Sequence, residues 1–317
     1  MNKFTITEDF PNNEAEFNKR FCEETNCEKY LFNYRWPEGF ICPKCGFKSY
    51  WKTAKGLYMC QRCESQHSIT AQTIMHGTRR PLTLWFKAMW WFTTKKSGFN
   101  AVDLQNYLGL GSYTTAWSWL QKLRCCTIRS DREKLSGTIE VDEFYLGGQR
   151  SGKRGRGAEH KYPVAVAVEK KGKKLGRLRL QVIEDCSESQ LSPFIHANVE
   201  PGSTVLTDGW KGYNFFEDQE YEHHTIISSK AKNKESVLPG VHLIASLVNR
   251  LITGTFQGRF EKKYLQQYFD EYVFRLNRRN TKSIGKRFFR IVQQAMVAKP
   301  LSLLQIKLGM ASLSLAN

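Results

Sequence analysis

The stretch Cys42-Pro-Lys-Cys45, followed after fourteen residues by Cys60-Gln-Arg-Cys63, decides the fold of the first part of the chain. Each pair forms a C-x2-C knuckle, and a short hairpin between the pairs would bring four thiolates into the tetrahedron that zinc prefers. Residues 56–60 predict a strand of that hairpin. Because sulfur fills all four positions, none is left open for catalysis, and the pattern predicts a structural zinc ribbon. The activity must therefore lie elsewhere.

The chain is strongly basic. Its 317 residues, enough for two or three domains, carry 48 Lys and Arg against 30 Asp and Glu, a formal net charge of +18. This excess predicts a polyanionic partner, most simply nucleic acid, with a membrane surface as the competing polyanion. No stretch approaches 18 consecutive apolar residues, and the N-terminus lacks a signal-peptide core. An odd number of cysteines beside a zinc site indicates a reducing cytosol.

A helix-turn-helix is predicted after the ribbon. Pro81 opens an aromatic helix over 82–95, whose tryptophans we expect in the core. Two short helices then follow, over 101–107 and 112–124, joined by a turn that contains glycine. Ser112 is a good N-cap for the second helix, whose first residues would lead into the DNA major groove. These candidate DNA contacts are Tyr113, Thr114, Thr115 and Ser118. A helical hairpin used only for packing is the alternative.

After residue 136 the pattern changes from helices to strands. The predicted strands are 137–146, 163–169, 178–182, 203–208 and 224–227, and the predicted helices are 187–199, 238–253 and 262–278. Three initial strands fit an antiparallel meander, and the remaining elements fit right-handed crossovers. This order predicts an α/β domain of the RNase H-like class, with a mixed five-stranded sheet and flanking helices.

Two carboxylates stand out in this domain. Asp142 lies inside the first strand, and Asp208 closes the fourth. In an RNase H-like sheet these strands are neighbours, so the two acids would converge on one edge. Convergent carboxylates suit Mg²⁺, and two such ions about 4 Å apart can activate a nucleophile and stabilise a leaving oxygen in phosphoryl transfer. Without that fold, Asp208 and Gly209 form a simple turn.

Taken together, these motifs resemble the zinc-ribbon DDE transposases of bacterial insertion sequences, the ISXO type related to eukaryotic Merlin elements. The resemblance runs in order from about residue 15 to 280. Besides the cysteines, the matching segments are 78–82 (TRRPL), 108–117 (LGLGSYTTAW), 141–148 (VDEFYLGG), 152–157 (GKRGRG), 207–213 (TDGWKGY), 241–255 and 268–279.

The resemblance implies an RNase H-like core that cuts and joins element-end DNA with Mg²⁺, for which Mn²⁺ can substitute. Asp142 and Asp208 match the first two catalytic acids. His242, thirty-four residues after Asp208, matches the third position, where related enzymes carry Glu or Asn. A neutral imidazole suits Mg²⁺ poorly, so His242 could instead orient a water or the scissile phosphate. Asn249 stands where a Lys is more usual, and the adjacent Arg250 could replace its phosphate contact.

Two other acids compete for the third catalytic position. Glu143 follows Asp142 directly and would point to the opposite face of a regular strand. Glu271 lies on a later helix, where pairing with Arg275 four residues on is the simpler role.

A basic loop follows the first predicted strand. Its side chains, spaced by glycines, could follow a phosphate backbone, or the loop could be a solvated hairpin. The candidate contacts are Arg150, Lys153, Arg154 and Arg156.

The expected function is therefore that of a transposase that binds the terminal inverted repeats of its element and its target DNA, as a homodimer or larger assembly. We expect it in the bacterial cytoplasm, associated with the nucleoid and not with a membrane. A domesticated DNA-binding regulator without chemistry and a nuclease without strand joining are the alternatives.

The expected parts are an N-terminal helical segment (1–35), the zinc ribbon (36–75), the helix-turn-helix region (76–130), the DDE-type catalytic domain (137–280) and a C-terminal helical tail (281–317).

Overall fold

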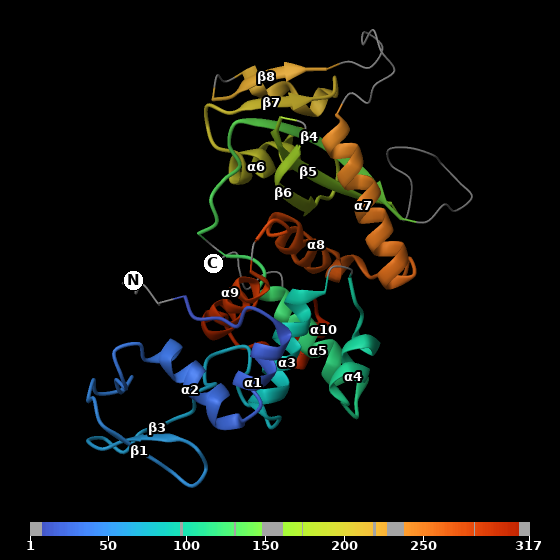
Figure 1. Ribbon diagram of the computed structural model, residues 1–317. Helices are drawn as coiled ribbons and strands as arrows, with labels where there is room; N and C mark the ends of the chain where they lie inside the picture. Colours follow the sequence, from blue (N-terminus) through green and yellow to red (C-terminus); the bar gives the residue numbers. More distant parts are fainter. Residues whose placement is uncertain are drawn as a thin grey trace. The chain divides into compact units, whose positions relative to one another are not determined.

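The structure is a computed structural model that describes residues 8–95, 98–129, 131–147, 161–172, 174–217, 220–226, 238–281 and 283–310. The chain divides into two compact units (Figure 1). The first unit comprises Met1–Arg129 together with Asn280–Asn317, and the second comprises Ser130–Arg279. The last part of the chain therefore returns to the unit that contains the N-terminus.

The first unit combines helices with a small antiparallel sheet. The sheet has the order β1-β2-β3, with β1 over Tyr50–Lys52, β2 over Tyr58–Cys60 and β3 over Gln66–His67. The helices are α1 (Glu14–Arg20), α2 (Glu24–Arg35), α3 (Leu82–Thr94), α4 (Ala101–Leu108), α5 (Tyr113–Cys125), α9 (Ile284–Val297) and α10 (Leu303–Lys307).

Aromatic side chains form the core of the first unit. Trp85 and Trp90 of α3 are buried, which confirms that this aromatic helix belongs to the core. Phe288 of α9 is fully buried, with its ring 5.5 Å from that of Phe17 and 5.7 Å from that of Trp90. Because α9 packs against α3, the C-terminal helix completes this core.

The second unit is built on a five-stranded mixed sheet with the order β6-β5-β4-β7-β8. Its strands are β4 (Thr138–Leu146), β5 (Tyr162–Lys171), β6 (Lys174–Val182), β7 (Thr204–Thr207) and β8 (Glu222–Thr225). The first three form an antiparallel meander, whereas β7 pairs in parallel with both β4 and β8. The prediction that the first and fourth strands are neighbours is therefore confirmed.

Helices cover both faces of this sheet. On one face, α6 (Glu188–Asn198) and the short helix η1 (Lys211–Glu217) pack over the apolar side chains of β4, β5 and β7. On the other face, α7 (Pro239–Phe256) packs against β4 and β5. Each residue of β4 therefore faces one of two different helical layers.

The helix α8 (Lys262–Asn277) lies along the edge strand β6 and replaces a neighbouring strand. The Asn277 side chain accepts a hydrogen bond from the Leu178 backbone N–H at 2.7 Å, and its amide donates to the Leu178 carbonyl at 3.1 Å. Gln266 makes the same kind of contact with the N–H of Val182 at 2.9 Å and the carbonyl of Leu180 at 3.1 Å. These amides satisfy an edge that would otherwise expose unpaired backbone groups.

One local expectation differs from the structure, and another agrees with it. The third strand begins at Lys174, four residues earlier than predicted, because its polar start pairs with the end of β5. Ser112 is the N-cap residue of α5, as predicted, although its side chain makes no capping hydrogen bond.

Candidate zinc site and candidate catalytic site

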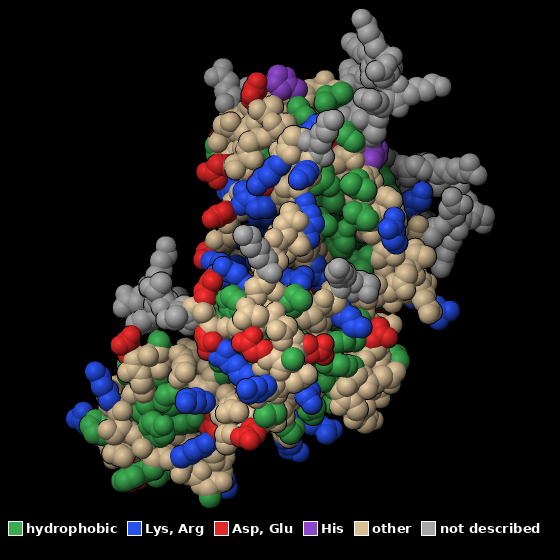
Figure 2. Space-filling model, viewed as in Figure 1, with side chains coloured by type: hydrophobic (Ala, Val, Ile, Leu, Met, Phe, Trp, Pro, Cys, Tyr) green, Lys and Arg blue, Asp and Glu red, His purple; other side chains and the backbone are tan. Residues whose placement is uncertain are grey.

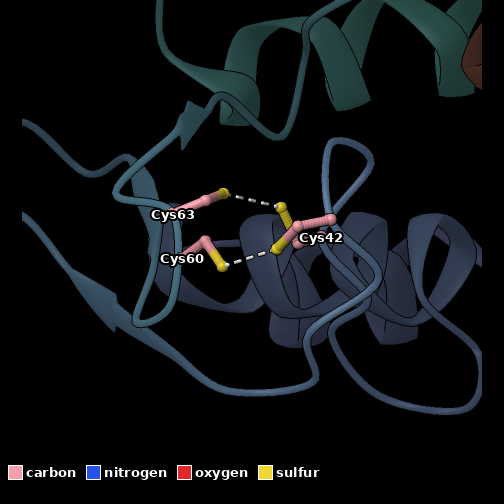
Figure 3. A group of neighbouring side chains, drawn as sticks. Cys42, Cys60 and Cys63 are labelled. Atoms are coloured by element: carbon pink, nitrogen blue, oxygen red, sulfur yellow. Dashed lines mark hydrogen bonds between the residues drawn. The ribbon is translucent and has the colours of Figure 1, made fainter.

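The four cysteines of the ribbon meet in one place. Figure 3 shows the sulfur atoms of Cys42, Cys60 and Cys63 turned toward a common space between the two knuckles. Sulfur–sulfur distances are 3.6 Å for Cys42–Cys63 and 3.5 Å for Cys45–Cys60, and all four sulfurs lie within 4.8 Å of one another. A tetrahedral zinc with Zn–S bonds of about 2.3 Å requires sulfurs about 3.8 Å apart, so this set of thiols fits zinc.

Polar neighbours lower the pKa of Cys42 and of Cys63, which supports the thiolate form of these two ligands. The Ser65 hydroxyl lies 3.3 Å from the Cys42 sulfur and 3.0 Å from the Cys63 sulfur. Burial raises the pKa of the Cys42 thiol, but hydrogen bonds with Ser65, with two backbone N–H groups and with His67 hold that pKa at about 5. Metal binding needs deprotonated cysteines, so the ribbon favours the ionised form of this ligand before any metal arrives.

One exposed aromatic residue of the ribbon was missed by the sequence reasoning. Tyr50 and Lys52 of β1 are exposed but have partners, the Tyr58 ring at 5.0 Å and the Glu28 carboxylate at 2.6 Å respectively. Trp51 lies between them and faces the opposite side of the strand, with 54% of its surface exposed. A tryptophan in a short strand of a small metal-held module was the signal that could have identified it.

The two candidate metal ligands of the second unit lie on neighbouring strands, Asp142 in the middle of β4 and Asp208 just after the end of β7. In the parallel register of β4 and β7, Glu140 is opposite Leu206. Asp142 and Asp208 each lie two residues further along, Asp208 directly after the end of β7. Since partners in a parallel register share a face, this register places Asp142 and Asp208 on the same side of neighbouring strands. The Asp208 carboxylate is also held by the Trp210 backbone N–H at 3.0 Å.

Tyr213 connects this part of β4 to the layer formed by α6 and η1. Its hydroxyl donates to the Glu143 carboxylate at 3.0 Å, and both side chains are buried. Burial, and then the negative charges of Glu143, Asp142 and Asp208, raise the pKa of the Tyr213 phenol. Of these three carboxylates, Glu143 is the one that accepts the hydrogen bond from Tyr213. Glu143 contacts the layer opposite to α7, as its position after Asp142 predicts.

His242 lies in the first turn of α7, and its side chain is exposed. Asn249 and Arg250 lie further along the same helix and are also exposed. Among the described residues, the four ribbon cysteines are the group in which three or more metal-binding side chains come together. Their ligand atoms lie within 4.8 Å of one another. The register of β4 and β7 places Asp142 and Asp208 on neighbouring strands, and the structure does not gather His242 with them into such a cluster.

Glu271, the second rival for the third catalytic position, forms an ion pair on α8. Its carboxylate pairs with the Arg275 guanidinium at 2.7 Å, and both side chains are buried on α8. The predicted pairing four residues apart is confirmed.

Comparison with known proteins agrees with this arrangement. Residues 134–277 match the ISXO2-like transposase domain family, and residues 23–66 match the transposase zinc-ribbon domain family. The chain therefore carries one domain similar to each of these two families. A relative from Halobacterium salinarum (strain ATCC 700922 / JCM 11081 / NRC-1), named as an uncharacterized protein in transposable element ISH50, is 25% identical over 216 residues. The matched region covers 62% of this chain and 71% of the relative.

The candidate DNA contacts of the chain are only partly described. At the start of α5, Tyr113 and Thr114 are exposed, whereas Thr115 and Ser118 are half-buried. The Ser118 hydroxyl donates to the Thr115 carbonyl at 2.9 Å. The basic-loop candidates Arg150, Lys153, Arg154 and Arg156 lie outside the described residues. Figure 2 shows Lys and Arg side chains on the visible face of both units of the chain.

As for membranes, none of the helices in the described ranges has the length and apolar character that a membrane span requires.

Proposed function

We propose that the protein is a transposase that cuts the DNA ends of its own mobile element and joins them to target DNA, using Mg²⁺ held by Asp142 and Asp208. The observation that carries the proposal is the parallel register of β4 and β7, which places both carboxylates on neighbouring strands. The strand order β6-β5-β4-β7-β8, with an antiparallel meander followed by parallel strands, supports an RNase H-like assignment of the second unit.

The chemistry divides among a few side chains. Asp142 and Asp208 offer the hard oxygen ligands that Mg²⁺ takes from proteins together with substrate phosphates. When bound, Mg²⁺ would supply activation of the attacking oxygen and stabilisation of the leaving oxygen. Water would be the first attacking group and would free a 3′-hydroxyl, which would then attack a target phosphate. His242 would orient the water or the scissile phosphate, and Asn249 and Arg250 would contact flanking phosphates.

DNA recognition is assigned to the first unit. The ribbon between residues 41 and 67 carries five basic residues and one acidic residue, all of them exposed, and it presents Trp51 between them. The pair α4 and α5, joined by a turn with Gly109 in the left-handed region, would act as a helix-turn-helix whose second helix leads with Tyr113 and Thr114. The loop over 150–161 would follow the phosphate backbone beside the catalytic strand.

A DNA-binding regulator without chemistry remains the second candidate function. It is favoured by His242 and Asn249, which occupy positions where related enzymes carry an acid and a Lys. A chain that has kept both aspartates without using them would bind element ends and leave them intact.

An assay of cutting and joining tests the proposal. The full chain is incubated with labelled duplexes from the DNA that flanks its gene, with Mg²⁺ and a supercoiled target plasmid. The proposal predicts cut ends and covalently joined products, counted separately, from a complex holding two DNA ends and at least two chains. Bound but uncut ends would support the regulator, and cutting without joining would support a nuclease.

A further inference from the structure

We infer that the buried carboxylate of Glu140 is a positioning residue that fixes the start of α7, and with it His242, against the strand that carries Asp142. This inference rests on the proposed function, because it gives His242 a role in the same site.

Glu140 is only 1% exposed and makes three polar contacts. One carboxylate oxygen, Oε2, accepts hydrogen bonds from the backbone N–H groups of Gly240 at 2.7 Å and Val241 at 3.1 Å. The other oxygen, Oε1, pairs with the Lys170 ammonium group at 3.1 Å. A buried carboxylate is stable only with such partners, so the start of α7 supplies most of what keeps Glu140 in place.

The start of α7 in turn depends on Glu140. The N-cap of α7 is Leu238, which has no side-chain capping bond, and Pro239 has no N–H to donate. The first free donors of the helix are therefore those of Gly240 and Val241, and Glu140 binds both. A negative charge at this position also interacts favourably with the positive end of the helix dipole. The acid of β4 thus performs the capping that the residues before α7 do not.

The close contact between Glu140 and the backbone of α7 requires a glycine at position 240. A Cβ atom at Gly240 would lie 2.7 Å from Glu140 Oε2 and 3.0 Å from Leu175 Cδ2. No side chain can therefore be added without displacing the carboxylate or the helix. Gly240 and Glu140 are in direct contact, although they are 100 residues apart in the chain.

The contact joins two candidate catalytic residues. Glu140 and Asp142 are two residues apart on β4, share a face and are separated by about 6.6 Å along the strand. His242 directly follows the clamped Val241 on α7. Loss of the Glu140 clamp would free the first turn of α7, so His242 would no longer be held in a fixed place relative to Asp142.

A double-mutant cycle tests this role. Single-turnover cutting of labelled ends with Mg²⁺ is compared for the parent, Glu140→Gln, His242→Ala and the double variant. Residues that orient active groups typically cost ~10–100-fold when changed, and we expect a loss in this range for Glu140→Gln. Because Glu140 acts through His242, the double variant should cut about as slowly as the slower single variant.

The matched control is Glu169→Gln, a change to another buried carboxylate that accepts bonds from the backbone N–H groups of Ser136 and Arg177. Its effect on cutting should multiply with that of His242→Ala. Multiplication of the two losses in the Glu140 and His242 double variant would overturn the inference, as would parent-like cutting by either single variant.

Amide hydrogen exchange gives a readout that does not need activity. The N–H groups of Gly240 and Val241 should exchange faster in Glu140→Gln than in the parent and should be unchanged in Glu169→Gln. If the parent fails to cut DNA, the proposed function fails, while this exchange measurement still decides whether Glu140 holds α7. Unchanged exchange in Glu140→Gln would refute the clamp itself.

Discussion

At the scale of single residues, the candidate site depends on how the parallel register of β4 and β7 places two short side chains. Neither Asp142 nor Asp208 is unusual in its local sequence, since one lies in a strand and the other begins a turn held by the Trp210 N–H. Their placement on neighbouring strands comes from the pairing of β4 with β7, although the two residues are sixty-six positions apart in the chain. The site is therefore a property of the sheet more than of either segment.

Substitution of His242 distinguishes a residue that orients reactive groups from one that holds the metal. We expect His242→Ala to cut element ends about 10–100-fold more slowly than the parent, as for residues that orient reactive groups without holding the metal. His242→Glu, which restores the acid found in related enzymes, should keep part of the activity. Single-turnover cutting rates measure both effects.

Glu271→Gln is the comparison for this prediction. It weakens a buried ion pair with Arg275, so it should lower stability and leave the cutting rate of the folded chain within a few-fold of the parent. An inactive Glu271→Gln beside a fully active His242→Ala would place the third catalytic residue on α8.

At the scale of elements, the zinc ribbon and the helix pair α3 and α9 are each stabilised in a different way. The ribbon has short strands and depends on its four sulfurs, whereas α3 and α9 depend on packed rings. The two elements should therefore respond to different perturbations.

Loss of one sulfur should release the metal of the ribbon. We expect Cys42→Ser and Cys60→Ser each to lose one zinc per chain, with local unfolding of β1 to β3, because metal binding supplies the folding free energy of so small a module. Metal analysis of the purified chains measures the loss. Cys22→Ser, at an exposed cysteine away from the knuckles, should keep its zinc. Full zinc content in both knuckle variants would exclude the site.

Removal of the central ring of α9 should destabilise the first unit. We expect Phe288→Ala to lower its free energy of unfolding by about 3–5 kcal/mol, the usual cost of removing a buried phenyl ring. Val297→Ala, at a 62% exposed position of the same helix, should change it by less than about 0.5 kcal/mol. Denaturant unfolding followed by tryptophan fluorescence suits this test, because seven of the eight tryptophans lie in the first unit. Equal midpoints for the two variants would mean that α9 is not part of this core.

Local patterns predicted much of this architecture. The cysteine spacing is itself the ligand geometry, and the apolar run of β5 permits little other than a buried strand. The polar start of β6 was not predictable, because Arg177 is held there by Glu169 of the neighbouring strand and by the Lys134 carbonyl, 43 residues earlier in the chain. The same holds for Phe288 and Glu140, whose partners are far along the chain. Contacts between distant segments leave no local periodicity to detect.

At the scale of the whole molecule, recognition and chemistry are assigned to different units, and the net charge of +18 serves both. We expect binding of element ends by the full-length Asp142→Asn chain to weaken steeply with salt. The logarithm of the binding constant should fall against the logarithm of the salt concentration with a slope of about −0.9 per neutralised phosphate.

Lys48→Ala, at an exposed ribbon position, should reduce the magnitude of this slope by about one. Trp51→Ala should lower the affinity and leave the slope unchanged. Fluorescence anisotropy across a salt series measures all three, and parent-like binding by both ribbon variants would remove the ribbon from the interface.

The central claim is that Asp142 and Asp208 hold the metal that drives cutting and joining, and a metal-preference switch tests it most directly. Cutting by Asp142→Cys and Asp208→Cys is compared in Mg²⁺ and in Mn²⁺, because a thiolate ligand favours the softer ion. Stabilisation by a bound metal is worth several kcal/mol and about 1.4 kcal/mol corresponds to tenfold, so losses of about hundredfold or more are expected in Mg²⁺, with partial recovery in Mn²⁺. Asp→Asn variants should bind DNA and stay inactive in both ions, and Glu143→Cys should show no new preference. The same ratio of Mn²⁺ to Mg²⁺ activity in the parent and in both Asp→Cys variants would contradict the account.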